Sequence, residues 1–182
     1  VSGINDERSL QYLLQQLGHE DAQVRYRAVT GLLNFAPEQW LGSVTPLLQD
    51  KVRAVRIATA NLLISINNPQ MLSGLGGAYA KAADELRDYI MYQSDFASGN
   101  VMAADYFYKL KDYTNAEKFY RKALQKDNTM NYARLNLATL YNAVHENNEA
   151  LKILQEALAV DDKNERIYFN LALLYNEMND IK

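Results

Sequence analysis

The stretch from Asn136 to Leu158 reads NLATLYNAVHENNEALKILQEAL, and its pattern decides the fold. Apolar residues recur in it at spacings of three and four, at Leu137 and Tyr141 and again throughout residues 150–158. This spacing places them on one face of an α-helix, so the stretch predicts two amphipathic helices joined by a short turn. The basic unit of the chain is therefore expected to be a helical hairpin.

The hairpin pattern repeats with a step of 34 residues across the second half of the chain. Small residues at fixed places let neighbouring helices approach closely, while large residues fill the space between them. The step therefore predicts regular packing of one hairpin on the next. The superposed sets are Ala104, Ala138 and Ala172; Ala116 and Ala150; Ala123 and Ala157; Phe107, Tyr141 and Tyr175; Ala103, Leu137 and Leu171; and Tyr120 with Leu154.

Two motifs, Asn136-Leu137-Ala138-x-x-Tyr141 and Glu149-Ala150-x-x-x-Leu154-x-x-Ala157-Leu158, resemble the tetratricopeptide repeat (TPR) family. The resemblance covers residues 97–182, as units 97–130 and 131–164 and a partial unit 165–182, and it implies a TPR superhelix. The chain departs from the family pattern at Asn128 and Asp162, where proline is usual, and at His145, where glycine is usual. Asn and Asp are compatible with turns and helix ends, so we expect the fold to tolerate them.

The first half repeats with a different step, of 31 residues, which superposes Leu17 on Leu48 and Val24-Arg25 on Val55-Arg56. These motifs resemble HEAT repeats and imply a HEAT-like pair over residues 1–68, with helices near 6–17, 21–35, 38–49 and 52–66. Residues 69–96 are expected to form a junction and a capping helix, near 70–93. The predicted fold is thus all-α, an α-solenoid of helical hairpins with a HEAT-like part followed by a TPR superhelix.

The composition suits a folded helical chain and excludes several classes of function. Of 182 residues 48% are apolar, whereas glycine (8) and proline (3) are few. A net charge of −3 offers no basic surface, so nucleic acid is not an expected partner. The absence of cysteine excludes disulfides, thiolate metal ligands and covalent haem attachment within this chain. No apolar run reaches the roughly 20 residues that a membrane span requires.

Few residues suggest chemistry. The two histidines, His19 and His145, lie in predicted turns of different halves, and neither stands in a catalytic or metal-binding pattern. The glycines at 74, 76 and 77 lack the strand and the lysine that a phosphate loop requires, so a helix junction is expected there. We therefore predict that the chain is not an enzyme and has no catalytic residue, metal site or cofactor.

A groove is expected along the first helices of the TPR-like units, because these helices line the groove of TPR proteins. Asn136 and Asn170 match the asparagine ladder by which some TPR superhelices hold a peptide backbone. Val101 and Asp105 stand where TPR domains that bind acidic chaperone tails carry basic residues, so this ligand class is disfavoured. The predicted groove residues are Val101, Asp105, Tyr108, Tyr132, Leu135, Asn136, Thr139, Arg166, Phe169 and Asn170.

The leading functional hypothesis is a non-catalytic scaffold that binds a protein or an extended peptide, since helical repeats present extended surfaces. The alternative is a rigid arm that positions an upstream domain. The order of HEAT-like pair, helix around 85–90 and TPR units resembles the carboxy-terminal part of bacterial multihaem c-type cytochrome-like TPR proteins, which implies an extracytoplasmic location and a redox domain upstream of Val1.

The unit from 165 is expected to lack its second helix and so to expose an apolar face for self-association. The residues of this expected face are Leu171, Leu174, Tyr175 and Met178.

Overall fold

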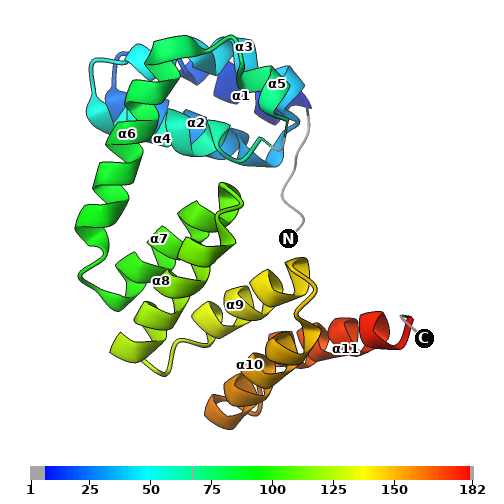
Figure 1. Cartoon of the computed structure of the whole chain (residues 1–182). Helices are drawn as coiled ribbons and strands as arrows, with labels where there is room; N and C mark the ends of the chain where they lie inside the picture. Colours follow the sequence, from blue (N-terminus) through cyan, green and yellow to red (C-terminus); the bar gives the residue numbers. More distant parts are fainter. Residues whose placement is uncertain (1–6, 67, 181–182) are drawn as a thin grey trace. The chain divides into compact units, whose positions relative to one another are not determined.

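The computed structural model describes residues 7–66 and 68–180, and within these ranges every regular element is a helix (Figure 1). The described ranges hold eleven α-helices, three short 3₁₀ helices and no strand. The prediction of an all-α helical-repeat fold is confirmed. The chain divides into two compact units, of which the first ends at Tyr89 and the second begins at Ile90.

The first unit consists of helical hairpins followed by most of a long helix. Its α-helices are α1 (Glu7–Gln16), α2 (Ala22–Gly31), α3 (Leu41–Val44), α4 (Arg53–Leu63), α5 (Pro69–Leu72) and α6 (Gly76–Gln93), and its 3₁₀ helices are η1 (Leu32–Asn34), η2 (Pro37–Gln39) and η3 (Thr45–Gln49). Asp21 caps α2 as predicted, because its carboxylate accepts the N–H of Gln23 at 2.8 Å. Helix α2 packs against α4 through buried residues such as Val29, Val55 and Leu63.

The third predicted helix, over 38–49, is wrong as a single element. The segment is broken into η2, α3 and η3. Pro46 explains the second break, because proline lacks an N–H and disfavours helical backbone in the residue before it. Trp40 anchors this irregular segment, since it is only 2% exposed and donates its indole N–H to the carbonyl of Phe35 at 2.9 Å.

The helix predicted over 70–93 is also divided. Asn68 caps the short α5 by accepting the N–H of Gln70, whereas its neighbour Asn67 lies outside the described residues. A turn at 73–75 separates α5 from α6, and Gly76 has a φ of +56°, which only glycine adopts without strain. The glycine-rich segment is therefore a helix junction, as expected.

The second unit contains α7 (Ala97–Lys109), α8 (Tyr113–Lys126), α9 (Asn131–Ala143), α10 (Asn147–Val160) and α11 (Glu165–Asp180), besides the end of α6. Helices α7, α9 and α11 begin 34 residues apart, which is the step found in the sequence. The turns within the two hairpins place Lys111 and His145 in left-handed conformation, with φ values of 60° and 63°. His145 thus occupies a backbone conformation that suits glycine.

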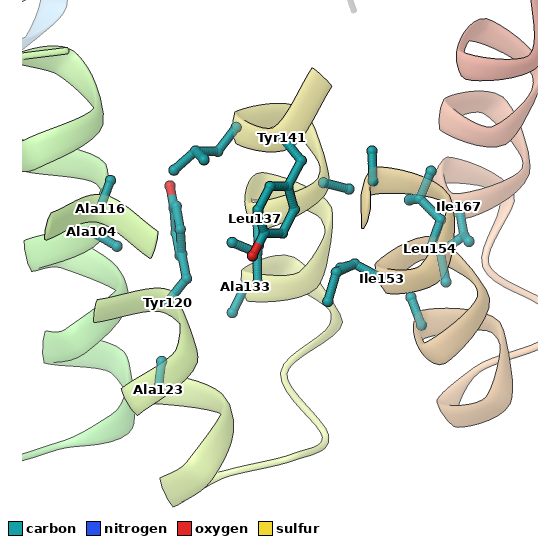
Figure 2. Close-up of a cluster of buried hydrophobic side chains, with 14 of the residues drawn as sticks. Ala104, Ala116, Tyr120, Ala123, Ala133, Leu137, Tyr141, Ile153, Leu154 and Ile167 are labelled. Atoms are coloured by element: carbon teal, nitrogen blue, oxygen red, sulfur yellow. The ribbon is translucent and has the colours of Figure 1, made fainter. Parts of the chain in front are cut away.

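Alanines and a few large side chains form the core of the second unit (Figure 2). Ala104, Ala116 and Ala123 are fully buried, and Tyr120 extends from α8 toward α9, where it is 2% exposed. A glycine allows a still closer approach at the start of α7, because a Cβ on Gly99 would lie 1.7 Å from the carbonyl oxygen of Gln93. Small residues therefore set the distance between helices, as the superposed alanines predict.

A second regularity of this unit lies in its loops. Asn100, Arg134 and Tyr168 occupy equivalent places in α7, α9 and α11, and each donates a hydrogen bond to the carbonyl six residues earlier. The accepting residues are Ser94, Asn128 and Asp162, at distances of 2.6, 2.6 and 2.8 Å. Each loop is thus tied to the helix that follows it, including at Asn128 and Asp162, where the TPR pattern has proline.

The expected exposed face of α11 requires correction. Leu171 and Leu174 are buried, with exposures of 9% and 4%, because α11 packs on α10 and α9. Met178 is partly buried against the same core, and only Tyr175 of the four predicted residues is exposed.

Candidate functional site

Two adjoining pockets form a groove on the second unit, of about 460 and 490 Å³. Both are lined by Tyr132, Asn136 and Thr139 of α9. The first pocket is completed by α7 and Tyr120, and the second by α11. Because residues three and four apart lie on one face of a helix, the groove follows the common face of α7, α9 and α11. We call these the α7 pocket and the α11 pocket.

Nine of the ten predicted groove residues line these two pockets. The α7 pocket holds Asp105 and Tyr108, the α11 pocket holds Leu135, Arg166, Phe169 and Asn170, and the three α9 residues named above belong to both. Val101 was placed wrongly, because it is only 5% exposed and belongs to the core. The equivalent positions one and two steps later are the half-buried Leu135 and the 64% exposed Phe169, so exposure rises along this set.

Asp105 organises the α7 pocket. Its carboxylate accepts hydrogen bonds from the hydroxyl of Tyr120 at 2.5 Å, the amide of Asn136 at 3.0 Å and the hydroxyl of Tyr132 at 3.3 Å. These donors come from α8 and α9, whereas Asp105 belongs to α7. The carboxylate therefore joins the first hairpin to the next one at the groove.

The two asparagines of the predicted ladder differ in their surroundings. Asn136 donates its amide to Asp105, whereas Asn170 donates to the carbonyl of Arg166 within its own helix at 2.7 Å. The carbonyl of Arg166 lies within helix α11, where it has a helical role as well. Asn170 can therefore turn toward a ligand at little cost, while Asn136 would have to share its amide between Asp105 and the ligand.

Burial changes the titration of several groups in the α7 pocket. Desolvation raises the pKa of Tyr120, and its hydrogen bond to Asp105 raises it further, so the hydroxyl stays protonated as a donor. Desolvation likewise raises the pKa of Tyr108. The pKa of Lys109, which also lines this pocket, is lowered by desolvation, and the negative charge of Asp105 opposes that shift.

Three lining residues were missed as groove residues. Tyr120 was assigned only to the core, and Lys109 and Glu165 were not singled out. Lys109 follows Asp105 by one helical turn, so the spacing of four could have identified it. Tyr120 could not be recognised in this way, because it reaches the groove from the second helix of its hairpin.

A catalytic or metal-binding arrangement does not emerge from the described ranges. Residues 7–66 and 68–180 contain no group of three or more His, Asp or Glu side chains placed to hold a metal ion. His19 accepts the N–H of Asp21 at its Nδ1, and His145 sits in a turn, so both histidines occupy turns as predicted. Over the same part of the chain, none of the helices combines the length and the apolarity needed to cross a bilayer.

Comparison with known families adds to this geometry. The sequence model of HEAT repeats matches residues 10–93. The match passes residue 68, the predicted end of the HEAT-like pair, and continues to the end of α6. No curated protein matches the chain. The first unit is thus similar to HEAT repeats, and the fold as a whole is an all-α helical repeat of the kind that commonly serves as a scaffold for protein interaction.

Proposed function

We propose that this chain is a non-catalytic scaffold whose second unit, a TPR-like array, binds an extended peptide segment of a partner protein in the groove of α7, α9 and α11. The observation that carries the proposal is the groove itself, two adjoining pockets that share three residues of one helix. Helical repeats recognise partners through such surfaces built from successive hairpins.

The lining of the α11 pocket suits a peptide. Phe169 and Tyr132 are large and exposed, at 64% and 52%, and aromatic side chains of this kind often anchor interfaces. Asn170 and Arg166 stand beside them with groups that can donate to backbone or side-chain oxygens. An apolar anchor next to polar donors is the combination expected of a site for an extended chain.

The test is selection of random heptapeptides displayed on phage against the whole chain, followed by calorimetry with the selected peptides. Phe169→Ala should weaken binding by about tenfold or more, since truncation of an interface anchor typically costs over 1 kcal/mol. Tyr12→Ala is the matched control, because Tyr12 is equally exposed, at 62%, but lies in the first unit.

The asparagines allow a finer test. Each contact to a peptide backbone is worth roughly 0.5–1.5 kcal/mol, so Asn136→Ala with Asn170→Ala should weaken binding by about one to two orders of magnitude. Asn170→Ala alone should leave the melting temperature unchanged, whereas Asn136→Ala also removes a hydrogen bond to Asp105 and should lower it slightly. Failure to select any peptide would count against the proposal and favour the rigid-arm alternative.

A further inference from the structure

The α7 pocket combines one carboxylate with three tyrosines. Asp105 lies in it together with Tyr108, Tyr120 and Tyr132. Tyr120 is buried, Tyr108 is half-buried and Tyr132 is 52% exposed, so the rings extend from the floor of the pocket to its rim. The faces of aromatic rings carry negative partial charge and attract cations, most strongly where water is excluded.

The hydrogen bonds of Asp105 hold it in place without neutralising it. Its three donors, the hydroxyls of Tyr120 and Tyr132 and the amide of Asn136, are all uncharged groups. Uncharged donors orient a carboxylate but leave its full negative charge available to a cation. The carboxylate is thus already positioned before any ligand arrives.

We propose that the α7 pocket receives the ammonium group of a lysine side chain of the bound peptide, with Asp105 as its counter-ion and the tyrosines as its walls. This inference rests on the proposed function and specifies the chemistry of the peptide. The pocket volume of about 460 Å³ falls within the range of ordinary ligand pockets, roughly 300–1,000 Å³.

Lys109 is the internal competitor for this place. It lines the same pocket, one helical turn after Asp105, and it feels the charge of that carboxylate. Desolvation disfavours its charged form there, as the lowered pKa shows. A ligand ammonium that reaches Asp105 would release the Lys109 side chain toward solvent, where its charge is hydrated. The two residues should therefore act in opposite directions on cation binding.

The experiment titrates the whole chain with butylammonium chloride, the head group of a lysine side chain, and with 1-pentanol, which has a similar shape and no charge. The readout is the NMR signals of tyrosine rings labelled with ¹³C. Butylammonium should shift the signals of Tyr108, Tyr120 and Tyr132 saturably, whereas 1-pentanol should bind at least fivefold more weakly.

Two variants give the expected opposite effects. Asp105→Asn keeps the shape but removes the charge and should weaken butylammonium binding by about five- to tenfold, while Lys109→Met should strengthen it. Glu156→Gln and Lys152→Met are matched controls for charge, because both residues are exposed on α10 and line neither pocket. Lys109→Met leaves the Asp105 hydrogen bonds intact, so this arm stays informative even if Asp105→Asn folds poorly.

Equal binding of butylammonium and 1-pentanol, or no response to Lys109→Met, would overturn the inference. The peptide selection separates this failure from that of the proposed function. Selected peptides without a shared lysine would overturn the cation site and leave peptide binding standing. Selected peptides with a shared lysine, whose affinity falls in Asp105→Asn, support both.

Discussion

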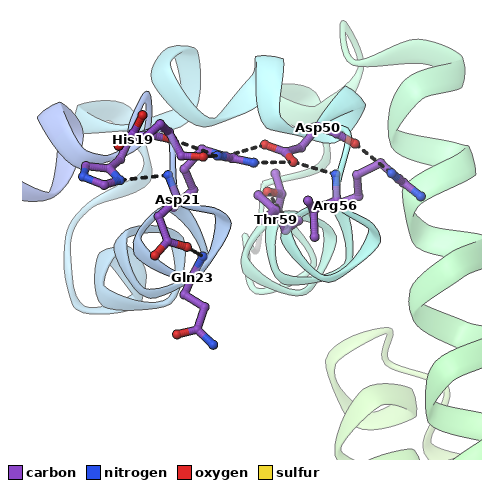
Figure 3. Close-up of polar contacts among 10 residues, drawn as sticks. His19, Asp21, Gln23, Asp50, Arg56 and Thr59 are labelled. Carbon is purple, nitrogen blue, oxygen red and sulfur yellow. Dashed lines mark hydrogen bonds and ion pairs between the residues drawn. The ribbon is translucent and has the colours of Figure 1, made fainter.

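The two units link their successive hairpins in different ways. In the first unit a series of charged groups makes the link (Figure 3): Arg25 forms a bidentate ion pair with Asp50, at 2.7 and 2.9 Å, and Arg56 donates to the carbonyl of Asp50 and to the carboxylate of Glu85. In the second unit alanines and aromatic side chains make it by close packing. The first link depends on a few strong partners, whereas the second is shared among many weak contacts.

Burial makes this difference consequential. The side chains of Arg25 and Asp50 are only 7% and 6% exposed, so neither charge could be solvated if it lost the other. The ion pair Glu117–Arg121 of the second unit is 36% and 48% exposed and lies within α8. Substitutions should therefore act through unpaired charge in the first unit and through lost packing in the second.

The largest effect should come from Tyr141→Ala in the second unit. Tyr141 is 3% exposed, and removal of a buried aromatic side chain costs about 3–5 kcal/mol. Tyr175→Ala is the matched control, because Tyr175 occupies the equivalent position of α11 but is 47% exposed, so its removal should cost less than about 1 kcal/mol. Thermal unfolding followed by circular dichroism would measure both; equal losses would contradict a packing-based link.

The next effect should come from Asp50→Ala in the first unit, at about 3 kcal/mol, since breaking a buried ion pair leaves an uncompensated charge. Trp40 is the sole tryptophan and is buried in this unit, so its fluorescence reports the unfolding of the first unit selectively. Asp84→Ala serves as the control, because the Asp84–Arg87 pair is exposed and should contribute little. A small loss for Asp50→Ala would show that packing dominates here as well.

Acid should destabilise the first unit to a smaller extent. The hydrogen bonds from Arg25 and Arg56 lower the pKa values of Asp50 and Glu85 below their ordinary values near 4. Depressed carboxylate pKa values stabilise the fold above the pKa of the unfolded chain, and that contribution is lost as pH falls through the lower, folded-state values. Trp40 fluorescence should therefore show a loss of stability below about pH 4.

The Asp50→Asn and Glu85→Gln variants check this origin. Together they should flatten the acid-dependent loss, because the unfolded and folded chains then bind equal numbers of protons at these two sites. Asp84→Asn should not change the profile. An undiminished loss in the double variant would assign the acid sensitivity to other carboxylates.

The smallest effect should be a gain. His145→Gly places glycine at a φ of 63°, where other residues are strained by roughly 1–2 kcal/mol, and the added flexibility of the unfolded chain offsets part of that relief. We expect a net stabilisation of about 0.5–1 kcal/mol in urea unfolding. His145→Ala provides the comparison, since alanine keeps the strain and should not stabilise the chain.

The sequence predicted the regular parts of the fold better than the irregular ones. The helix starts at Ala97, Asn131 and Glu165 follow the apolar spacing and the 34-residue step. The 38–49 segment was predicted as one helix because its apolar spacing was weighed above the effect of Pro46 on the residue before it. Local spacing therefore predicts a helix well where no backbone breaker competes with it.

For the candidate site, the sequence predicted which helix faces line the groove but not who bonds to whom. The face follows from helical periodicity, which is a local property. The partners of Asp105 follow from how two hairpins stack, so the side chain of Asn136 could not be assigned to it in advance. Val101 was misplaced for a similar reason, since its burial depends on neighbours that spacing does not reveal.

The loop hydrogen bonds of the second unit have a consequence for how such repeats are detected and altered. Asn100, Arg134 and Tyr168 differ in length, charge and shape, yet each meets the carbonyl six residues before it. Any scoring of substitutions by residue similarity treats these three as unrelated. A scoring by donor capacity and reach treats them as synonyms, because the invariant part of this signal is the acceptor, which every peptide unit carries and mutation cannot remove.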